Sequence, residues 1–401
     1  MNILQITKYF YPAISFGGPV QCTYNLSKYL VKRGHKVTVY TTDALDISTN
    51  ARIKEKHQEI DGVDVFYFRN LAKFHGLFVS PGIIHTLRKT IGNFDVVHLH
   101  EYRTFQNLAF QLLNNKRVPY VLSCHGEFTY NQESWDNFLL RRLFEYAFGK
   151  KLVDRASRLL ALTQFEAAQY FDAGIDQNKI VVVPNGVAPE EFSDASQAGS
   201  LRKAYGIAEE EIVLYLGRIA RGKGIDTLVK AFALLAKSRS DVKLVLAGPD
   251  DGFVSPLRKL VASLNLEGKV LFTGCLNRRQ VLAAYNDATF VVYPSIQEGF
   301  GLVPLEAGIM GRPVIVSDAP AMDFVKRGRF GLTVKYGSVS QLNEAMQTIL
   351  NGPEKAREFG RNGQRFVTDN YSWEAVGKRI EDVYYNVSGC FSDSFSRAKI
   401  G

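Results

Sequence analysis

Short runs of apolar and β-branched residues alternate along the chain with longer stretches of helical periodicity. The first run, at residues 2–6, leads through a glycine-containing loop into a helical pattern over about residues 20–32. Gly34 ends this helix, and a β-branched strand follows at 36–40. A strand, loop, helix and strand in this order predict a βαβ unit, and such units build a parallel sheet that is covered on both faces.

The predicted strands fall into two series, separated by a polar stretch of small residues at 189–197. We therefore predict an α/β protein with two doubly wound, Rossmann-like parallel-sheet domains at 1–190 and 191–372, followed by a helix at 372–387. Open sheets of this kind bind ligands at the carboxyl ends of their strands, so we expect the site in a cleft between the domains. The strands are predicted at 2–6, 36–40, 63–68, 95–100, 120–123, 158–162 and 179–183, and at 211–216, 243–247, 270–273, 289–293, 313–317 and 331–334.

Composition narrows the class of protein. The chain has 401 residues, of which 46% are hydrophobic and 22% charged, values that exclude a disordered, collagen-like or coiled-coil protein. Its four cysteines are far apart and form no C-x-x-C pair, which argues against a disulfide framework or a zinc ribbon. No apolar run reaches the ~18–20 residues of a membrane span, and residues 2–6 resemble a strand more than a signal peptide. We therefore expect a cytoplasmic protein.

The formal net charge of +9 is spread over the whole chain. No block of five or six like charges occurs, so a nucleic-acid partner is not expected. A mildly basic balance suits small phosphorylated ligands or anionic lipid head groups better.

Two glycine-containing loops have features of phosphate sites. Gly17 and Gly18 follow the first strand, where paired glycines let the backbone approach an anion at a helix start, although an ordinary turn fits as well. The loop at 217–224 carries Arg218 and Lys223, and one guanidinium with one ammonium suits a diphosphate, although a solvated basic loop would look the same. Neither loop matches G-x-G-x-x-G or the Walker pattern, which disfavours an NAD(P) oxidoreductase.

A third segment carries two carboxylates. Glu298 lies in the loop after a predicted strand, and Glu306 lies in or near the first turn of the next helix, where Pro304 is tolerated. A carboxylate accepts two hydrogen bonds at once and suits the vicinal diol of a ribose or a sugar, although the helix dipole alone would also favour Glu306 there. The amides that open this helix and could face a phosphate are those of Gly301, Leu302 and Val303.

Histidines mark the end of two strands in the first series. His125 follows the strand at 120–123 and precedes a glycine, where it can hydrogen-bond a hydroxyl or assist proton movement. A structural role is the alternative for a single histidine. His98 and His100 share one face of their strand, but no third metal ligand can be identified, so we interpret them as packing or acceptor-side residues.

In this order, the fragments resemble family 4 of the retaining nucleotide-sugar glycosyltransferases over residues 1 to about 375. The specific part of the pattern is the Glu-x7-Glu signature of Glu298 and Glu306 combined with Arg218 and Lys223. The further matching elements are Gly17-Gly18, residues 34–39, His125-Gly126, residues 183–187, Gly217, Gly224 and Ala307-Gly308.

The resemblance implies the GT-B fold, in which two Rossmann-like domains face each other across a cleft and a last helix, here 373–388, crosses back onto the N-terminal domain. It implies transfer of a hexose-type sugar from a UDP- or GDP-sugar with retention of configuration. The acceptor would be a glycan, a glycolipid or a lipid-linked molecule of polysaccharide or glycoconjugate biosynthesis. No metal ion and no cofactor besides the nucleotide-sugar co-substrate is expected.

The resemblance also implies roles by position. Arg218 and Lys223 would hold the diphosphate, Glu306 the ribose and Glu298 the donor sugar, with His125 near the reaction centre. The departing phosphate would deprotonate the incoming hydroxyl, and the two cations would stabilise it. The other donor-binding positions would be Gly17, Gly18, Gly274, Cys275, Leu276, Gly299, Phe300, Gly301, Leu302 and Val303.

Acceptor and membrane contacts have weaker signals. The polar and aromatic segment of Glu101, Tyr102 and Arg103 follows a strand in the half where the resemblance places the acceptor. Residues 135–151 mix apolar and basic side chains, which is typical of a surface helix with its apolar stripe in the core or of a helix on the inner face of the cell membrane. A non-catalytic nucleotide- or glycan-binding module on the same scaffold is the alternative to an enzyme.

Overall fold

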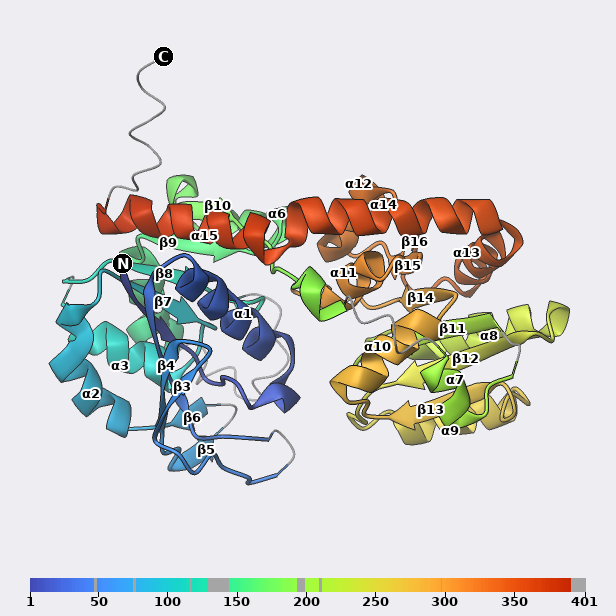
Figure 1. Cartoon of the computed structure of the whole chain (residues 1–401), viewed down its shortest axis with the longest axis horizontal. Coiled ribbons are helices and arrows are strands. Elements are labelled where there is room, and N and C mark those ends of the chain that lie inside the picture. Colours follow the sequence, from blue (N-terminus) through green and yellow to red (C-terminus); the bar gives the residue numbers. More distant parts are fainter. Residues whose placement is uncertain are drawn as a thin grey trace, which may run out of the picture. The chain divides into compact units, whose positions relative to one another are not determined.

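The computed structural model describes residues 1–46, 49–74, 77–115, 117–128, 144–192, 199–208, 211–296 and 298–390. The chain separates into two compact units (Figure 1). Unit 1 is formed by Met1–Gly186 and by the chain from Trp373 onward, and unit 2 by Val187–Ser372.

Unit 1 contains an eight-stranded sheet in the order β10-β9-β8-β7-β1-β2-β4-β3. All neighbours are parallel except β3, which pairs antiparallel with β4 at one edge. The register places Ile3 opposite Val37 of β2 and opposite Val96 of β7, so β1 is the central strand on which both halves of the sheet are built. The strands are β1 (Asn2–Ile6), β2 (Lys36–Thr42), β3 (His57–Ile60), β4 (Val63–Phe68), β7 (Val96–His100), β8 (Tyr120–Ser123), β9 (Arg158–Ala161) and β10 (Ile180–Val182).

Helices cover this sheet on both faces. Figure 1 shows the strands between α1 on one side and α2 and α3 on the other. Both faces are therefore covered, and β7 is buried at every position, including those of His98 and His100. The helices of unit 1 are α1 (Gly18–Lys32), α2 (Gly82–Thr90), α3 (Phe105–Leu113), α5 (Lys150–Arg155), α6 (Gln164–Asp172) and α15 (Trp373–Ser388).

The last helix, α15, packs on unit 1. Its buried side includes Trp373, Val376, Ile380 and Tyr384, the helical spacing expected from the sequence. Gly377 allows the close approach to α1, because a Cβ at this position would lie 2.5 Å from the ring of Tyr29.

Unit 2 contains a six-stranded, wholly parallel sheet in the order β13-β12-β11-β14-β15-β16. Its strands match the second predicted series in place and order. The strands are β11 (Glu211–Leu216), β12 (Val242–Ala247), β13 (Val270–Gly274), β14 (Phe290–Tyr293), β15 (Val314–Ser317) and β16 (Gly331–Val334). The helices are α7 (Ser200–Tyr205), α8 (Ile225–Ser238), α9 (Val254–Ser263), α10 (Arg278–Asp287), α11 (Leu302–Ile309), α12 (Asp323–Gly328), α13 (Val339–Asn351) and α14 (Pro353–Tyr371).

Three short strands were not predicted. The sequence of β3, His-Gln-Glu-Ile, is polar and half exposed at the sheet edge, so no apolar run marks it. The strands β5 (Ala72–Phe74) and β6 (Leu77–Val79) pair only with each other. Most of the predicted amphipathic stretch at 135–151 lies outside the described residues, and its described end forms a π-helical turn at Glu145–Gly149 and α5. Among the described helices, none is long and apolar enough to cross a membrane.

Candidate functional site

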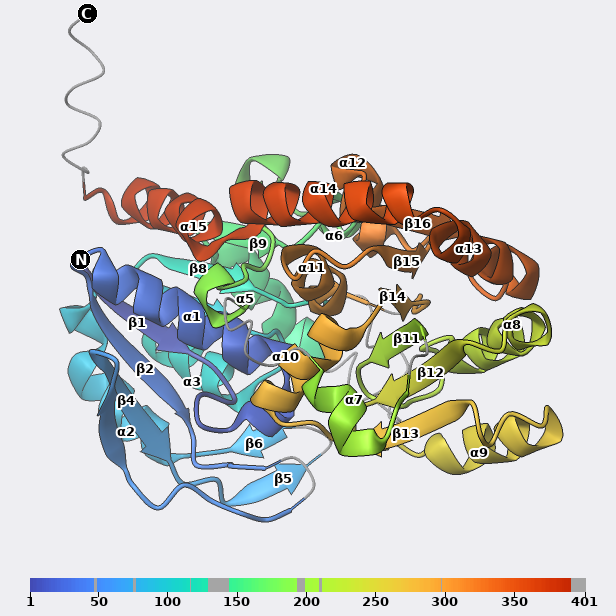
Figure 2. The ribbon, with the colours of Figure 1, turned by 45° about the vertical axis from the view of Figure 1, so that its right-hand side comes forward.

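Each sheet has a point at which the chain reverses the direction in which strands are added. In unit 2 this point lies between β11 and β14, and in unit 1 between β1 and β7. The loops that follow these strands diverge to opposite faces of the sheet, and the crevice between them is the usual ligand site of a doubly wound sheet. Figure 2, which turns the molecule by 45°, shows β11 and β14 side by side in unit 2. Each unit is described in turn.

In unit 2 the loop after β11 carries the two predicted phosphate-binding cations. Gly217, Gly222 and Gly224 all have positive φ angles, of 140°, 79° and 69°. Gly224 is required by its surroundings as well, because a Cβ there would lie 2.3 Å from the carbonyl oxygen of Pro294, the first residue after β14. This close approach ties the two loops of the switch point together.

Lys223 and Glu298 meet across this switch point. The Lys223 Nζ lies 2.5 Å from Glu298 Oε1, and both side chains are nearly buried. The Tyr293 hydroxyl, at the end of β14, donates to the same carboxylate oxygen at 2.7 Å. The ammonium group is therefore held at a fixed place between the two loops.

Arg218 lies in a different environment. Its guanidinium contacts Asp251 at 2.8 Å, and 60% of the side chain is exposed. An exposed ion pair of this kind contributes little stability, so the guanidinium can be redirected toward an anionic ligand at small cost.

Glu306 lies on α11, just past the first turn. Its Oε2 accepts a hydrogen bond of 2.7 Å from the Tyr285 hydroxyl, and Arg278 approaches its Oε1 at 3.6 Å. Burial raises the pKa of Glu306, and Arg278 and the Tyr285 hydroxyl offset only part of this effect. Because Glu306 is the fifth residue of the helix, the macrodipole of the first turn does not account for its position.

Arg278 is a candidate site residue that the sequence reasoning missed. It is the first residue of α10 and also forms an ion pair with Glu191 at 3.0 Å. The available signal was a basic residue two positions after the predicted donor-binding segment of Gly274, Cys275 and Leu276. Gly274, the last residue of β13, and Cys275, the first residue after it, are exposed, whereas Leu276 packs partly against the core of unit 2.

The helix α11 begins at Leu302, within the segment where the sequence predicted its start. Gly301 is its N-cap residue and provides no side-chain cap, so the first backbone N–H groups, including those of Leu302 and Val303, keep their donor capacity for a ligand. A Cβ on Gly301 would lie 2.6 Å from Met322, so a larger residue would disturb this turn. The side chain of Phe300 points toward Phe324 and Tyr371 instead, with ring centroids 5.5 and 6.1 Å apart.

In unit 1 His125 follows β8 and adopts a left-handed conformation with φ of 50°. This conformation is uncommon for a residue other than glycine and is found most often where a side chain has a function. Glu101, directly after β7, has the same unusual backbone with φ of 59°. Gly17 has φ of 82° before α1 and its Cα faces open space.

The imidazole of His125 is held by a buried histidine. Its Nε2 lies 3.1 Å from His100 Nδ1, and His100 Nε2 lies 2.9 Å from the amide oxygen of Gln5 on β1. Burial lowers the pKa of His125 to about 4 and lowers the pKa of His100 as well. Both rings are therefore neutral near pH 7, and His100 constrains the orientation of His125.

His98 forms the next part of the same polar core. Its two ring nitrogens contact the hydroxyl groups of Tyr384 on α15, at 2.6 Å, and Ser123 on β8, at 2.7 Å. Burial lowers the pKa of His98 to about 3. The interpretation of His98 as a packing residue fits these contacts.

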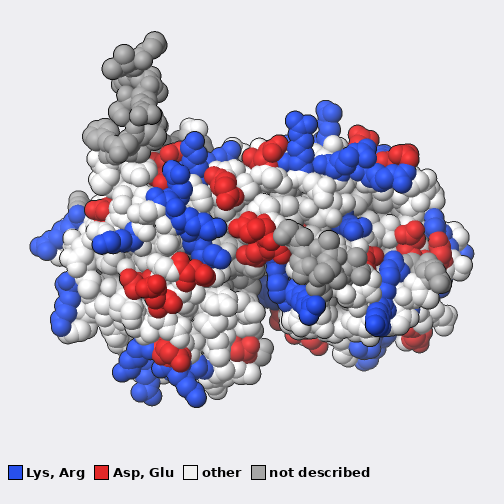
Figure 3. All heavy atoms as spheres, viewed as in Figure 1, with Lys and Arg blue, Asp and Glu red and all other residues white. Residues whose placement is uncertain are grey.

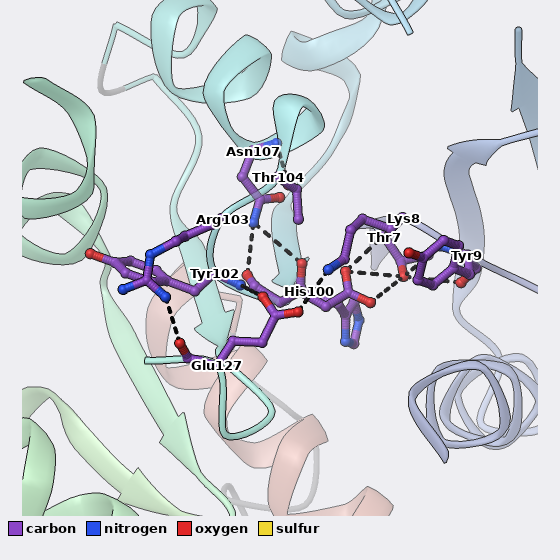
Figure 4. Close-up of polar contacts among 10 residues, drawn as sticks. Thr7, Lys8, Tyr9, His100, Tyr102, Arg103, Thr104, Asn107 and Glu127 are labelled. Atoms are coloured by element: carbon purple, nitrogen blue, oxygen red, sulfur yellow. Dashed lines mark hydrogen bonds and ion pairs between the residues drawn. The ribbon is translucent and has the colours of Figure 1, made fainter. Parts of the chain in front are cut away.

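A buried ion pair at the switch point of unit 1 was not predicted. The Lys8 Nζ lies 2.7 Å from Glu127 Oε1, while Glu101 accepts hydrogen bonds from the Thr7 hydroxyl and the Lys8 amide. Burial alone would lower the pKa of Lys8, but the carboxylates of Glu127 and Glu101 outweigh it and raise the pKa. Figure 4 shows Lys8, Tyr102 and Arg103 converging on Glu127.

The three residues expected on the acceptor side, Glu101, Tyr102 and Arg103, have buried side chains. They are only 1–6% exposed. Tyr102 and Arg103 both contact the carboxylate of Glu145, with Tyr102 Oη and Arg103 Nη2 at 2.6 and 2.8 Å from its oxygens. Their side chains therefore support the loop after β7 and do not face solvent, where they would meet an acceptor. Among the described residues no cluster of three His, Cys, Asp or Glu side chains is suited to a metal ion.

Comparison with known proteins identifies the family. The model of Glycosyltransferase Family 4 matches residues 16–191, and that of Glycosyl transferases group 1 matches residues 198–366. The chain is 30% identical over 330 residues to a D-inositol 3-phosphate glycosyltransferase of Pseudarthrobacter chlorophenolicus, covering 76% of both proteins. It is 27% identical over 400 residues to an uncharacterized glycosyltransferase of Methanocaldococcus jannaschii, covering 96% of this chain and 98% of the relative.

Solved structures agree on the fold. The Anabaena protein HepE in complex with UDP-glucose superimposes with a TM-score of 0.74 over 96% of this chain and 100% of its own, at 20% identity. The order of elements, the two parallel sheets and the matched models lead to one conclusion. The chain is a GT4-type glycosyltransferase with the GT-B fold.

Proposed function

We propose that this glycosyltransferase transfers a hexose-type sugar from a UDP- or GDP-sugar, with retention of configuration, to a hydroxyl of a glycan, glycolipid or lipid-linked acceptor. The observation that carries the proposal is the Lys223 ammonium, fixed by Glu298 at the switch point of the second sheet with Arg218 in the same loop. A guanidinium and an ammonium together supply the charge and donors that a diphosphate leaving group needs, so we expect the reaction to proceed without a metal ion.

The two glutamates are proposed to hold the sugars. Glu306 would accept the ribose hydroxyls, with Arg278 beside it, and Glu298 would orient the donor hexose. Both carboxylates already accept hydrogen bonds from a tyrosine hydroxyl, which suits a binding role better than that of a nucleophile. The departing phosphate oxygen would then take the proton of the incoming hydroxyl on the same face of the sugar, which gives retention.

The donor base and sugar are proposed from relatives. UDP-glucose is the ligand of the HepE structure, a neighbour that shares the fold at 20% identity, and a UDP-sugar is therefore the first donor to test. In unit 1 we propose that His125 lies near the reaction centre and that Gly17 and Gly18 approach the phosphate region. The Lys8–Glu127 pair, rather than Tyr102 or Arg103, would offer polar groups on the acceptor side.

A donor panel tests this proposal. UDP-glucose, UDP-galactose, UDP-N-acetylglucosamine and GDP-mannose are tested for protection against thermal unfolding and for release of nucleoside diphosphate. A donor at 100 times its Kd stabilises the protein by about 2.7 kcal/mol. Glu306→Gln should lose most of this protection, whereas Glu344→Gln, on an exposed site of α13, should keep it.

Two outcomes would contradict the proposal. If no donor raises the unfolding temperature and none is consumed, the assignment of the site in unit 2 is wrong. Protection by a donor without any release of nucleoside diphosphate, tested with mixed glycan and lipid acceptors, would favour the non-catalytic binding module.

A further inference from the structure

Unit 2 has a second polar groove, away from the carboxyl ends of its strands. It lies between the C-terminal end of α12 and the outer side of α14, and its volume is about 310 Å³. Three arginines line it, Arg327, Arg329 and Arg365. Figure 3 shows Lys and Arg side chains gathered along the edge of the molecule that α12 and α14 form.

Arg329 has an unfavourable backbone conformation. It ends α12 in the left-handed region, with φ of 49° and ψ of 43°, where glycine is strongly favoured. The Asn362 side-chain amide holds the turn by donating to the carbonyl of Arg329 at 3.0 Å. Among the contacts of the described residues, the guanidinium of Arg329 has no hydrogen bond or ion pair. A residue in an unfavourable backbone conformation, whose guanidinium has no hydrogen-bond or ion-pair partner among the described residues, points to a ligand.

The other two arginines of the groove differ in how firmly neighbouring side chains hold them. Arg327 is fixed by Asp323 at 3.2 Å and by the Tyr371 hydroxyl at 3.1 Å. Among the described residues, the ion-pair partner of Arg365 is Asp369, at the long distance of 3.8 Å. Arg329 and Arg365 can therefore turn toward a phosphate, which a guanidinium binds through two parallel hydrogen bonds.

The groove also contains hydrogen-bond acceptors. The carboxylate of Glu358 and the side-chain oxygens of Asn362 and Asn370 lie in its lining. Each asparagine amide nitrogen donates one of its two N–H groups, to the carbonyl of Arg329 or of Phe366, and the side-chain oxygens can accept hydrogen bonds from a ligand. Acceptors beside arginines suit a ligand that carries hydroxyl groups as well as a phosphate.

We propose that this groove binds a small phosphorylated polyol, with its phosphate on Arg329 and Arg365 and its hydroxyl groups on Glu358 and Asn362. The site shares no residue with the proposed donor site, so it does not depend on the proposed function. The head group of a phosphoinositide has the same chemistry as a free sugar phosphate, and the experiment separates the two sources.

The test uses Arg329→Gly, a change that relieves the strained backbone and so preserves folding. Asn265→Gly is the matched control, because Asn265 also follows a helix, α9, with φ of 54°. Both variants should unfold at the same temperature as the parent or higher. Both are made in the full-length Lys223→Ala protein, so that phosphate binding at the donor site does not interfere.

Ribose 5-phosphate, inorganic phosphate and ribose are titrated calorimetrically. We expect ribose 5-phosphate to bind, inorganic phosphate to bind more weakly and ribose not to bind, with at least a tenfold loss of affinity in Arg329→Gly and none in Asn265→Gly. Cosedimentation is measured with phosphatidylcholine vesicles that contain a phosphoinositide. If the protein binds these vesicles through Arg329 and does not bind ribose 5-phosphate, the site is supported and its ligand is the lipid head group. The proposal is overturned if the protein binds neither ribose 5-phosphate nor the vesicles, or if Arg329→Gly binds as well as the parent. If inorganic phosphate binds as tightly as ribose 5-phosphate, the site does not recognise the hydroxyl groups of a polyol.

Discussion

The two sheets place very different chemical groups at the carboxyl ends of their strands. All seven histidines of the chain lie in unit 1, and three of them form the buried polar core beneath the end of β8. Unit 2 has no histidine, and the loop at the carboxyl end of its strand β11 carries the cations Arg218 and Lys223. The same doubly wound architecture thus holds neutral, hydrogen-bonded imidazoles beside the buried Lys8–Glu127 pair in unit 1, and the cations Arg218 and Lys223 in unit 2.

Burial without an opposite charge explains why the histidines of the polar core in unit 1 are neutral. His98 and His100 are at most 2% exposed and lie between hydroxyl, amide and imidazole groups, so their neutral forms are favoured. Arg218 is 60% exposed, and the nearly buried Lys223 is paired with the carboxylate of Glu298. Neutral, hydrogen-bonded imidazoles are suited to holding a group in one orientation, whereas cations are suited to binding and stabilising a charged leaving group. The following predictions test this division.

The largest effect is expected for the cations in the loop after β11. Lys223→Ala should lower the rate of nucleoside diphosphate release from the accepted donor by about 10²–10³-fold, equivalent to about 2.7–4 kcal/mol, if the ammonium stabilises the leaving group as an oxyanion donor does. Lys230→Ala, in the helix that follows, removes an exposed ammonium 3.8 Å from Asp226 and should leave the rate unchanged. A well-folded Lys223→Ala protein that turns over at the parent rate would contradict the division.

The second effect concerns acid stability. The folded state lowers the pKa of His98 to about 3 and of His125 to about 4, so between about pH 6.5 and pH 4 the unfolded chain binds more protons than the folded one. Stability of unit 1 should therefore fall as the pH falls through this window. Glu127, whose pKa is lowered, adds to the trend, while Glu101, whose pKa burial raises to about 7, opposes it.

Tryptophan fluorescence can follow this transition selectively, because Trp373 belongs to unit 1 and the sequence of unit 2, residues 187–372, contains no tryptophan. On acidification we expect the fluorescence change to precede the loss of far-ultraviolet circular dichroism, to which both units contribute. His57→Gln, at a half-exposed position on β3, should not shift the transition. A single transition with coincident signals would show that the buried histidines do not set the acid limit of unit 1.

The smallest effect compares two glycines at the loops after β1 and β11. Gly17→Ala should cost about 1–2 kcal/mol of unfolding free energy, because its φ of 82° is left-handed but no atom lies within 4 Å of the new Cβ. Gly224→Ala should cost about 1–3 kcal/mol more, since the Cβ would meet the carbonyl of Pro294. Scanning calorimetry of both variants checks the difference, and equal costs would mean that the loops of unit 2 can move apart freely.

Most of the fold could be predicted from sequence, because buried parallel strands are continuous apolar and β-branched runs. Every strand of unit 2 was predicted within a few residues of its ends, and Pro304 and Gly301 marked the start of α11 correctly. The strand β3 was missed since its polar sequence lies on a sheet edge, where pairing and not burial defines the strand.

The residues of the site likewise include some that the sequence predicted and some that only the structure revealed. The sequence alone determined which loops carry the cations and carboxylates, because the residue types and spacings around Arg218, Lys223, Glu298 and Glu306 are local properties. Only the tertiary structure decided that Lys8 pairs with Glu127, 119 positions away, that Tyr102 and Arg103 face inward, and that Tyr384 reaches His98 across 286 positions. Such contacts depend on which strands become neighbours and how far each end is buried, and no local pattern of residues specifies either.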